Sequence, residues 1–155
     1  MATPPASAVD LERLDLESFR GRPVAVLGLA RSGVALARFL EDHGAEVTIY
    51  DGRPAEALAD AIAALGERRP RLLLGPDIDP HVALDGQALI CTSPSVNSRY
   101  PTTEPRLRNA LAAVEAAGTV PVLSEVDLFL RLCPARTVGI TGTKGKTTTS
   151  SLSAA

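Results

Sequence analysis

The sequence predicts an α/β fold in which a doubly wound parallel sheet of about five strands is followed by the start of a second domain. Short apolar runs of strand length alternate with segments of helical periodicity, a pattern typical of parallel βαβ units. Two of these runs lead into glycine-rich turns. Hydrophobic residues make up 45% and charged residues 22% of the 155 residues, which is enough apolar material for a packed core.

The expected elements follow one another closely along the chain. The expected strands cover residues 24–28, 46–50, 71–74, 88–91 and 120–123. The expected helices cover residues 32–43, 54–65, 80–84, 103–117 and 124–132. Gly44 and Gly66 follow the first two helices, where glycine commonly ends a helix, and Pro54 begins the second. Ser124 is the expected N-cap of the last helix, with Asp127 at its third helical position.

The chain divides into three parts. Residues 1–22 are polar and irregular and form a lead-in, residues 23–135 form the sheet domain, and residues 136–155 begin a second domain. Pro134 and Ala135 mark the boundary, because they lie just before a further β-rich run at 137–141. That run, an expected strand, enters the second glycine-rich turn.

Charge and composition exclude several classes of function. The formal net charge is −2, whereas general nucleic-acid binding relies on a basic surface. No apolar run approaches the roughly 18–20 residues of a membrane span, and no secretory signal opens the chain. Cys91 and Cys133 lack ligand spacing, so we expect free, buried thiols in a reducing cytoplasm. His43 is expected to bond free carbonyl groups at a helix end rather than a metal.

The first glycine-rich turn joins an expected strand to an expected helix. Residues 28–33 read GLARSG, close to the GxGxxG fingerprint of Rossmann-like dinucleotide-binding domains. Ala30 replaces the middle glycine and hinders close approach of a pyrophosphate, while the helix N–H groups and Ser32 still offer an anion site. Asp51 ends the second strand, where a carboxylate can accept hydrogen bonds from ribose hydroxyls or a base N–H. The alternative is a tight turn in which glycine serves only packing.

The second glycine-rich turn is more specific. Residues 139–149 read GITGTKGKTTT. Its Gly-Lys-Thr core supplies what a phosphate loop needs: backbone N–H groups, a lysine for the β/γ charge and a hydroxyl for Mg²⁺. Ile140 occupies the first glycine position of the standard GxxxxGK[ST] spacing. Of 16 basic residues only two are lysines, and both, Lys144 and Lys146, lie here. The alternative is a flexible turn with surface lysines.

Together the two loops resemble the Mur ligase family, ATP-dependent amide ligases that build the peptide stem of bacterial peptidoglycan. Folylpolyglutamate synthases share the phosphate loop but lack a preceding nucleotide-sugar domain of this kind. Three segments are most similar to the D-glutamate-adding branch: GLARSG at 28–33, DGR at 51–53 and SEVDLF at 124–129. The L-alanine-adding branch usually has a glycine-richer first loop and a histidine in the second. The resemblance covers essentially the whole chain, but only part of a full-length family member.

The resemblance implies that the sheet domain binds the UDP part of UDP-N-acetylmuramoyl-L-alanine. The implied UDP-sugar-binding residues are Arg31, Ser32, Asp51, Gly52, Arg53 and Ser93. The first two would face the diphosphate, and the next three would hold the uracil and ribose. Ser93 begins a turn that reads Ser-Pro-Gly in the family, and Ser95 departs from that pattern at the third position.

The resemblance also implies ATP and Mg²⁺ as cofactors and D-glutamate as the second substrate. The implied ATP-binding residues are Gly142, Thr143, Lys144, Gly145, Lys146, Thr147 and Thr148. Lys146 would be the catalytic lysine at the γ-phosphate, and Thr147 would help bind Mg²⁺. The implied reaction forms an acyl phosphate, from which the amine of D-glutamate displaces phosphate. Such an enzyme serves cell-wall biogenesis, cell shape and cell division in the cytoplasm, and we expect a monomer.

Two other functions stay open at this point. An NAD-binding oxidoreductase domain would have a glycine at position 30 and a catalytic domain after the sheet. A non-enzymatic nucleotide-binding module would bind a nucleotide without further chemistry. The family's other catalytic groups, namely a glutamate and a histidine for the metals, a carbamylated lysine and the C-terminal domain, are implied beyond residue 155. We therefore expect residues 1–155 alone neither to hydrolyse ATP nor to ligate.

Overall fold

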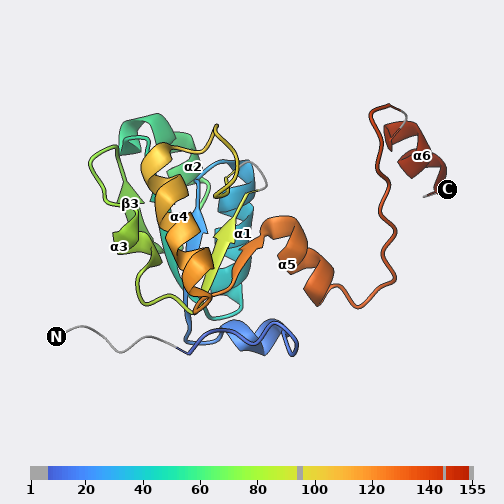
Figure 1. The fold of residues 1–155 in the computed structure, drawn as a ribbon, viewed down its shortest axis with the longest axis horizontal. Helices are drawn as coiled ribbons and strands as arrows, with labels where there is room; N and C mark the ends of the chain where they lie inside the picture. Colours follow the sequence, from blue (N-terminus) through green and yellow to red (C-terminus); the bar gives the residue numbers. More distant parts are fainter. Residues whose placement is uncertain (1–6, 94–95, 145, 154–155) are drawn as a thin grey trace.

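The computed structural model describes residues 7–93, 96–144 and 146–153. Its centre is a five-stranded parallel sheet in the order β3-β2-β1-β4-β5 (Figure 1). The strands are β1 (Pro23–Leu27), β2 (Glu46–Asp51), β3 (Arg71–Leu74), β4 (Leu89–Thr92) and β5 (Val122–Ser124). Every neighbouring pair is parallel, so the predicted α/β fold with about five strands is confirmed.

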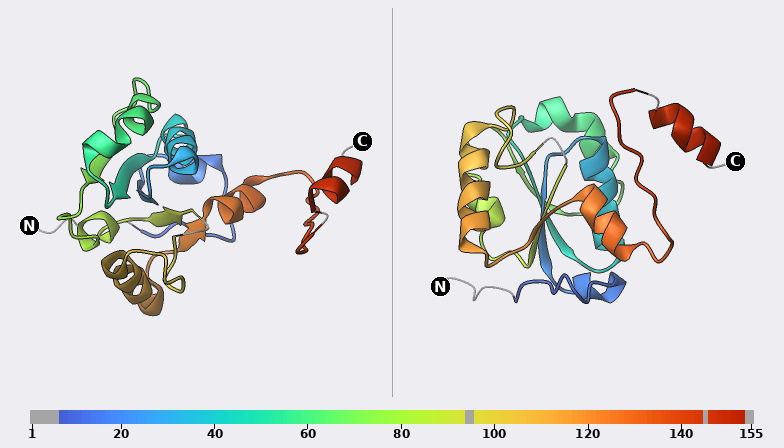
Figure 2. Two further views of the ribbon diagram at one scale, coloured as in Figure 1. Left: turned by 90° about the horizontal axis from the view of Figure 1, so that it is seen from above. Right: turned by 45° about the vertical axis from the view of Figure 1, so that its right-hand side comes forward.

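Helices cover both faces of the sheet (Figure 2). The helical elements, with η for a 3-10 helix, are η1 (Leu16–Phe19), α1 (Arg31–Asp42), η2 (Ala55–Leu58), α2 (Ala59–Ala63), α3 (His81–Leu84), α4 (Pro105–Ala117), α5 (Glu125–Leu132) and α6 (Lys146–Ser153). Residues of η1, α1, η2, α2 and α5 pack on one face, and residues of α3 and α4 pack on the other. The strand order reverses at β1, which is how right-handed crossovers reach both faces.

Alternation along the strands divides the buried side chains between two hydrophobic clusters. In β1, Val24 and Val26 belong to the cluster on the α1 face, and Ala25 and Leu27 belong to the cluster on the α4 face. All four are at most 1% exposed, as expected for the centre of a parallel sheet. This packing fixes the direction in which the last residues of each strand point.

The lead-in is more ordered than the sequence predicts. It contains η1, and Phe19 is fully buried in the cluster on the α1 face. The N–H of Val9 donates to the carbonyl of Ala88 at 2.9 Å, and Val9 is 5% exposed. The expectation of an irregular lead-in is therefore wrong in part, because two apolar side chains among polar neighbours anchor it to the sheet domain.

Element boundaries mostly agree with the sequence within two residues. The expected helix at 54–65 is instead divided into η2 and the short α2. Ser124 caps α5 as predicted, because its hydroxyl accepts from the N–H of Asp127 at 3.1 Å. The predicted role of His43 is also confirmed, since its Nδ1 lies 2.7 Å from the carbonyl oxygen of Phe39. Both cysteines are free thiols, with Cys91 buried and the second cysteine partly buried.

The expected strand at 137–141 is wrong: the structure has no strand there. A parallel strand needs a neighbour to exchange hydrogen bonds, and no strand of the sheet pairs with this segment. Val138 is accordingly 84% exposed. The chain runs from α5 to α6, which stands apart from the sheet domain (Figure 1). Within the described part of the chain, no helix combines the length and apolarity that crossing a membrane requires.

Candidate functional site

The carboxyl ends of the strands meet at one edge of the sheet, here called the carboxyl edge. In open α/β sheets, ligands bind outside this edge where the strand order reverses, which here lies between β1 and β4. Three predicted segments reach it: the 28–33 turn after β1, Asp51 at the end of β2 and Ser93 directly after β4. The fold therefore brings together predicted residues that lie far apart in the sequence.

The 28–33 turn is held tightly between β1 and α1. Gly28 has a φ of +97°, in the region that favours glycine, and its N–H donates to the carbonyl of Tyr50 at 2.7 Å. A Cβ on Gly33 would lie 1.9 Å from the carbonyl oxygen of Gly28. Only glycine permits this approach of the helix to the turn. Gly28 thus serves the conformation of the turn and Gly33 its packing, whichever ligand the turn binds.

Asp51 ties this turn to the end of β2. Its Oδ2 accepts from the N–H of Leu29 and from Nη2 of Arg53, both at 2.8 Å. Its Oδ1 accepts from the backbone N–H and the Nε of Arg53, both at 3.0 Å. A carboxylate offers about four acceptor positions, so the protein itself uses all of them. A ligand that bonds this carboxylate directly has to displace Arg53, whose side chain is 53% exposed.

These hydrogen bonds determine the charge of Asp51. Burial is the largest single influence and would raise the pKa of Asp51, but the hydrogen bonds from Arg53 and from the Leu29 N–H together outweigh it. The pKa of Asp51 is therefore held below its ordinary value. The same carboxylate accepts from the guanidinium and raises the pKa of Arg53. At neutral pH the two side chains form an ion pair with no net charge.

The three longer helices that begin at the carboxyl edge differ in their N-terminal caps. Glu104 caps α4, because its carboxylate accepts from the N–H of Leu107 at 2.8 Å, and Ser124 caps α5. The N-cap of α1 is Ala30, which makes no side-chain cap hydrogen bond, and the first turn of α1 has no acidic residue. The positive end of the helix dipole and free N–H groups attract anions. Of these three helices, α1 offers the anion site.

A cavity of about 380 Å³, here called the Asp51 cavity, lies at the carboxyl edge beside the start of α4. It is lined by Gly28, Tyr50, Asp51, Gly52, Val96, Thr102, Thr103, Glu104 and Leu107. Tyr50 is 2% exposed, and burial raises the pKa of its hydroxyl, which is therefore neutral at physiological pH. Neither Tyr50 nor Glu104 was predicted from the sequence as a site residue. The available signal for Tyr50 was its place at the end of a strand that enters the site.

Another cavity, of about 400 Å³ and here called the Arg31 cavity, is lined by residues of the turn, of α1 and of the segment after β2. Arg31 and Arg53 both line it, together with Leu29 and Ala30. Two predicted guanidinium side chains therefore border one cavity next to the uncapped start of α1. Paired N–H donors of this kind match phosphate oxygens.

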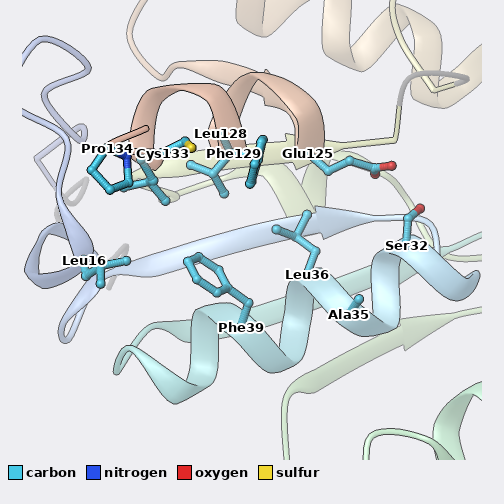
Figure 3. Close-up of a pocket in the computed structure, with 11 residues that line it drawn as sticks. Leu16, Ser32, Ala35, Leu36, Phe39, Glu125, Leu128, Phe129, Cys133 and Pro134 are labelled. Carbon is cyan, nitrogen blue, oxygen red and sulfur yellow. The ribbon is translucent and has the colours of Figure 1, made fainter. Parts of the chain in front are cut away.

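Ser32 lies at a different cavity. Figure 3 shows it near Glu125 at one end of an apolar groove of about 440 Å³ between α1 and α5. Phe39 and Phe129 are among the side chains that line this groove, and Phe129 is 61% exposed. Ser32 is not among the residues that line the Asp51 cavity or the Arg31 cavity. Its contact with a diphosphate stays a prediction.

The turn after β4 is described only in part. Ser93 is partly buried at the reversal of the strand order. Pro94 and Ser95 lie outside the described residues, so the predicted departure at Ser95 has no structural description.

In the second glycine-rich loop, α6 begins at Lys146, whose ammonium donates to the carbonyl of Gly142. The predicted loop residues Thr143, Lys144 and Thr147 are exposed. Gly145 and the side chain of Thr148 lie outside the described residues. A lysine and a hydroxyl at the start of a helix fit the phosphate-binding part of an ATP site.

The loop supplies fewer ligands for Mg²⁺ than donors for phosphate. This ion prefers oxygen ligands, usually one or two carboxylates together with phosphate oxygens and waters. Among the residues that the structure describes, no group of three or more His, Cys, Asp and Glu side chains could hold a metal ion. Binding of Mg²⁺ by Thr147 stays a prediction.

Comparison with known proteins gives relatives that share one name. No protein-family model matches the chain. Three UDP-N-acetylmuramoylalanine–D-glutamate ligases are similar: that of Trichlorobacter lovleyi is 41% identical over 134 residues, that of Streptococcus pneumoniae 37% over 138 and that of Cereibacter sphaeroides 36% over 149. These matches cover 86%, 88% and 90% of this chain.

The chain spans only 27–29% of the length of those relatives. Among solved structures, a dipicolinate synthase chain from Bacillus halodurans matches with a TM-score of 0.46 and 21% identity, over 82% of this chain and 41% of that one. The sequence similarity to the three ligases extends over nearly the whole chain. The chain therefore belongs to the Mur ligase family, and it corresponds to the N-terminal portion of the D-glutamate-adding ligases.

Proposed function

We propose that residues 23–135 bind the UDP part of UDP-N-acetylmuramoyl-L-alanine, within a ligase that adds D-glutamate to this substrate. The name of the relatives supplies the substrate class. The single observation that supports the binding site is the carboxyl edge, where the uncapped start of α1 meets the turn that Asp51 holds in place. Because the chain spans 27–29% of these relatives, the activity of the whole enzyme is part of the proposal.

The diphosphate would lie at the N-terminus of α1. Arg53, which the family resemblance placed on the uracil and ribose side, borders the same cavity as Arg31, so we propose that both donate to the diphosphate oxygens. The start of α4 is a poor alternative, because the Glu104 carboxylate already accepts from its N–H groups and would repel a phosphate. The Arg31 cavity is then the phosphate end of the site, and the Asp51 cavity is the nucleoside end.

Asp51 would act mainly as a positioning residue. Its four hydrogen bonds hold Leu29 of the turn and Arg53 after β2 in place. Loss of the carboxylate would free the turn and the guanidinium together. The shape of the phosphate end would therefore depend on a residue that does not itself contact the phosphates.

The second loop would hold ATP. Lys144 and Lys146 would neutralise phosphate charge, and Thr147 would offer its hydroxyl to Mg²⁺. Bound ATP would transfer its γ-phosphoryl group to the substrate carboxylate, which gives an acyl phosphate and leaves ADP. The amine of D-glutamate then bonds the acyl carbon, and inorganic phosphate leaves. Positioning and charge stabilisation account for most of the catalysis in such transfers.

Residues 1–155 alone would neither hydrolyse ATP nor ligate. In the described residues the segment before α6 pairs with no strand, and no cluster of metal ligands accompanies the loop. Release of phosphate from Mg-ATP by the purified 155-residue chain, at a rate above that of a Lys146→Ala variant, would contradict this expectation.

Calorimetric titration of the chain with UDP, NAD and ATP tests the proposed binding function. We expect one UDP per chain and weaker binding of NAD. Asp51→Asn should weaken UDP binding by about 10-fold, because the loss of hydrogen bonds to the carboxylate loosens the turn and Arg53, while Asp77→Asn on an exposed position should not. Tighter binding of NAD than of UDP would favour an oxidoreductase domain. A folded chain that binds none of the three would contradict the proposal.

A further inference from the structure

The Asp51 cavity contains one polar group that the proposed site does not use, the hydroxyl of Tyr50. Tyr50 is the next-to-last residue of β2, and its side chain packs in the cluster on the α4 face with Leu27 and Leu107. The residue is 2% exposed, and its hydroxyl has no hydrogen-bond partner among the residues that the structure describes. A buried aromatic ring here would pack equally well without the oxygen.

An unpartnered buried hydroxyl is unusual. Burying such a group without a hydrogen bond costs free energy, and the large majority of buried polar side-chain atoms have a partner. Phenylalanine would fill the same place at no such cost. The Tyr50 hydroxyl is therefore explained if its partner is a ligand that occupies the cavity beside it.

Gly52 borders both this buried hydroxyl and the cavity. A Cβ at position 52 would lie 3.9 Å from the Tyr50 hydroxyl oxygen, and Gly52 lines the same cavity. A larger side chain at position 52 would therefore extend over the oxygen. The absence of a side chain at position 52 avoids this further cover of the hydroxyl on the side of the cavity.

The surroundings indicate which part of a ligand the hydroxyl would meet. Burial keeps Tyr50 protonated, so its hydroxyl can donate a hydrogen bond. Asp51 and Glu104, both with a lowered pKa and thus ionised at neutral pH, line the same cavity. Each carboxylate is paired with an arginine, Arg53 or Arg106, so these pairs bring no net positive charge that would favour phosphate, whereas a neutral carbonyl group is tolerated beside them. The matching ligand group is an uncharged acceptor oxygen.

We propose that the Tyr50 hydroxyl binds the nucleotide by donating a hydrogen bond to a carbonyl oxygen of its pyrimidine base. This role rests on the proposed function, because that function supplies the uracil base. It makes Tyr50 a binding residue at the nucleoside end, about which the sequence motifs say nothing.

Tyr50→Phe removes the hydroxyl and keeps the ring, and Tyr100→Phe is the matched control because Tyr100 is 52% exposed and is not among the residues that line the Asp51 cavity. Calorimetric titration with UDP and with uridine should show about 3- to 10-fold weaker binding of both ligands to Tyr50→Phe. Tyr100→Phe should bind as the wild type does. Without ligand, the melting temperature of Tyr50→Phe should equal or exceed that of the wild type, because a buried unpartnered hydroxyl is lost.

A second measurement observes the hydroxyl directly. The chain has two tyrosines and no tryptophan, so Tyr50 is the only tyrosine of the Tyr100→Phe protein. With ¹³Cζ-labelled tyrosine, this protein gives a single ring-carbon signal in NMR spectra. UDP and uridine should shift this signal, and inorganic pyrophosphate should not.

The outcomes separate this inference from the proposed function. If the wild type binds UDP, and Tyr50→Phe binds it equally well with no shift of the Tyr50 signal, the role of Tyr50 is refuted while the proposed function stands. A shift caused by pyrophosphate would place phosphate in the Asp51 cavity and overturn the assignment to the base. If the folded wild type binds neither UDP nor uridine, both proposals fail.

Discussion

Replacing Asp51 by Asn tests how the carboxyl edge is held together. Asn keeps the shape of the side chain but presents one oxygen and one NH₂ group. Each carboxylate oxygen of Asp51 now accepts two N–H donors, one pair being Leu29 N–H and Arg53 Nη2, and the other the backbone N–H and Nε of Arg53. Whichever way the amide is turned, its NH₂ group therefore faces two donors, and two hydrogen bonds are lost.

The structure gives the expected size of this effect. A buried backbone N–H left without its acceptor costs about 1–3 kcal/mol. The bond to Arg53 contributes less, about 0.5–1 kcal/mol, since that side chain is 53% exposed and screened by solvent. We therefore expect Asp51→Asn to lower the free energy of unfolding by about 1.5–4 kcal/mol.

Urea unfolding followed by circular dichroism measures this change. Asp77→Asn, the same replacement at an exposed position, is the control and should lie within about 0.5 kcal/mol of the wild type. If Asp51→Asn unfolds like this control, the carboxylate does not hold the turn, and its role as a positioning residue is refuted.

Three further predictions concern pH, packing and thiol reactivity. The stability difference between wild type and Asp51→Asn should be complete above about pH 5, where the carboxylate is ionised in both the folded and the unfolded chain. It should be lost as the pH falls from about 4 through the lower folded-state pKa of Asp51. Urea midpoints that differ equally at all pH values would contradict this. Gly33→Ala should lower the free energy of unfolding by at least about 2 kcal/mol, because its Cβ would lie 1.9 Å from the carbonyl oxygen of Gly28. The control Gly139→Ala should unfold like the wild type, since a Cβ there would meet nothing within 4 Å. Equal melting curves for the two variants would exclude the close approach. Burial raises the pKa of Cys91 to about 12, so a thiol reagent at pH 8 should label only Cys133 in the folded chain and both cysteines in urea. Rapid labelling of Cys91 in the folded chain would show that β4 is not buried.

The sheet domain could be predicted because local and global signals agree there. Each strand is a short apolar run, and glycine or proline lies at the ends of several elements, so that pattern and turn chemistry give the same answer. The run at 137–141 has the same composition but pairs with no strand in the sheet. Strand formation depends on that neighbour, which no local pattern reveals. The anchoring of the lead-in by Val9 and Phe19 is likewise a tertiary effect.

The candidate site could be predicted as separate short segments, but not as the contacts between them. Asp51, Gly52 and Arg53 follow one another, and the structure places all three at the carboxyl edge. The bond from Leu29 to Asp51 joins residues 22 positions apart, and the unpartnered Tyr50 hydroxyl becomes visible only once α4 covers its face of the sheet. These features arise from packing between distant segments.

The sequence also could not predict which side of α1 faces which cavity. A motif places Ser32 beside the other loop residues, but Figure 3 shows Ser32 at the groove between α1 and α5. Which side of a helix faces which neighbour depends on how the two helices pack. For the same reason the sequence could not show that Arg31 and Arg53 line one cavity.

The most direct test of the central claim is NMR mapping of UDP binding on ¹⁵N-labelled protein, because the claim concerns where the nucleotide lies. Added UDP should shift the backbone amide signals of residues 29–33 at the start of α1 and of residues 51–53 after β2. UDP that binds without moving the amides of residues 29–33, or that shifts instead the amides of residues 104–107 at the start of α4, would contradict the account.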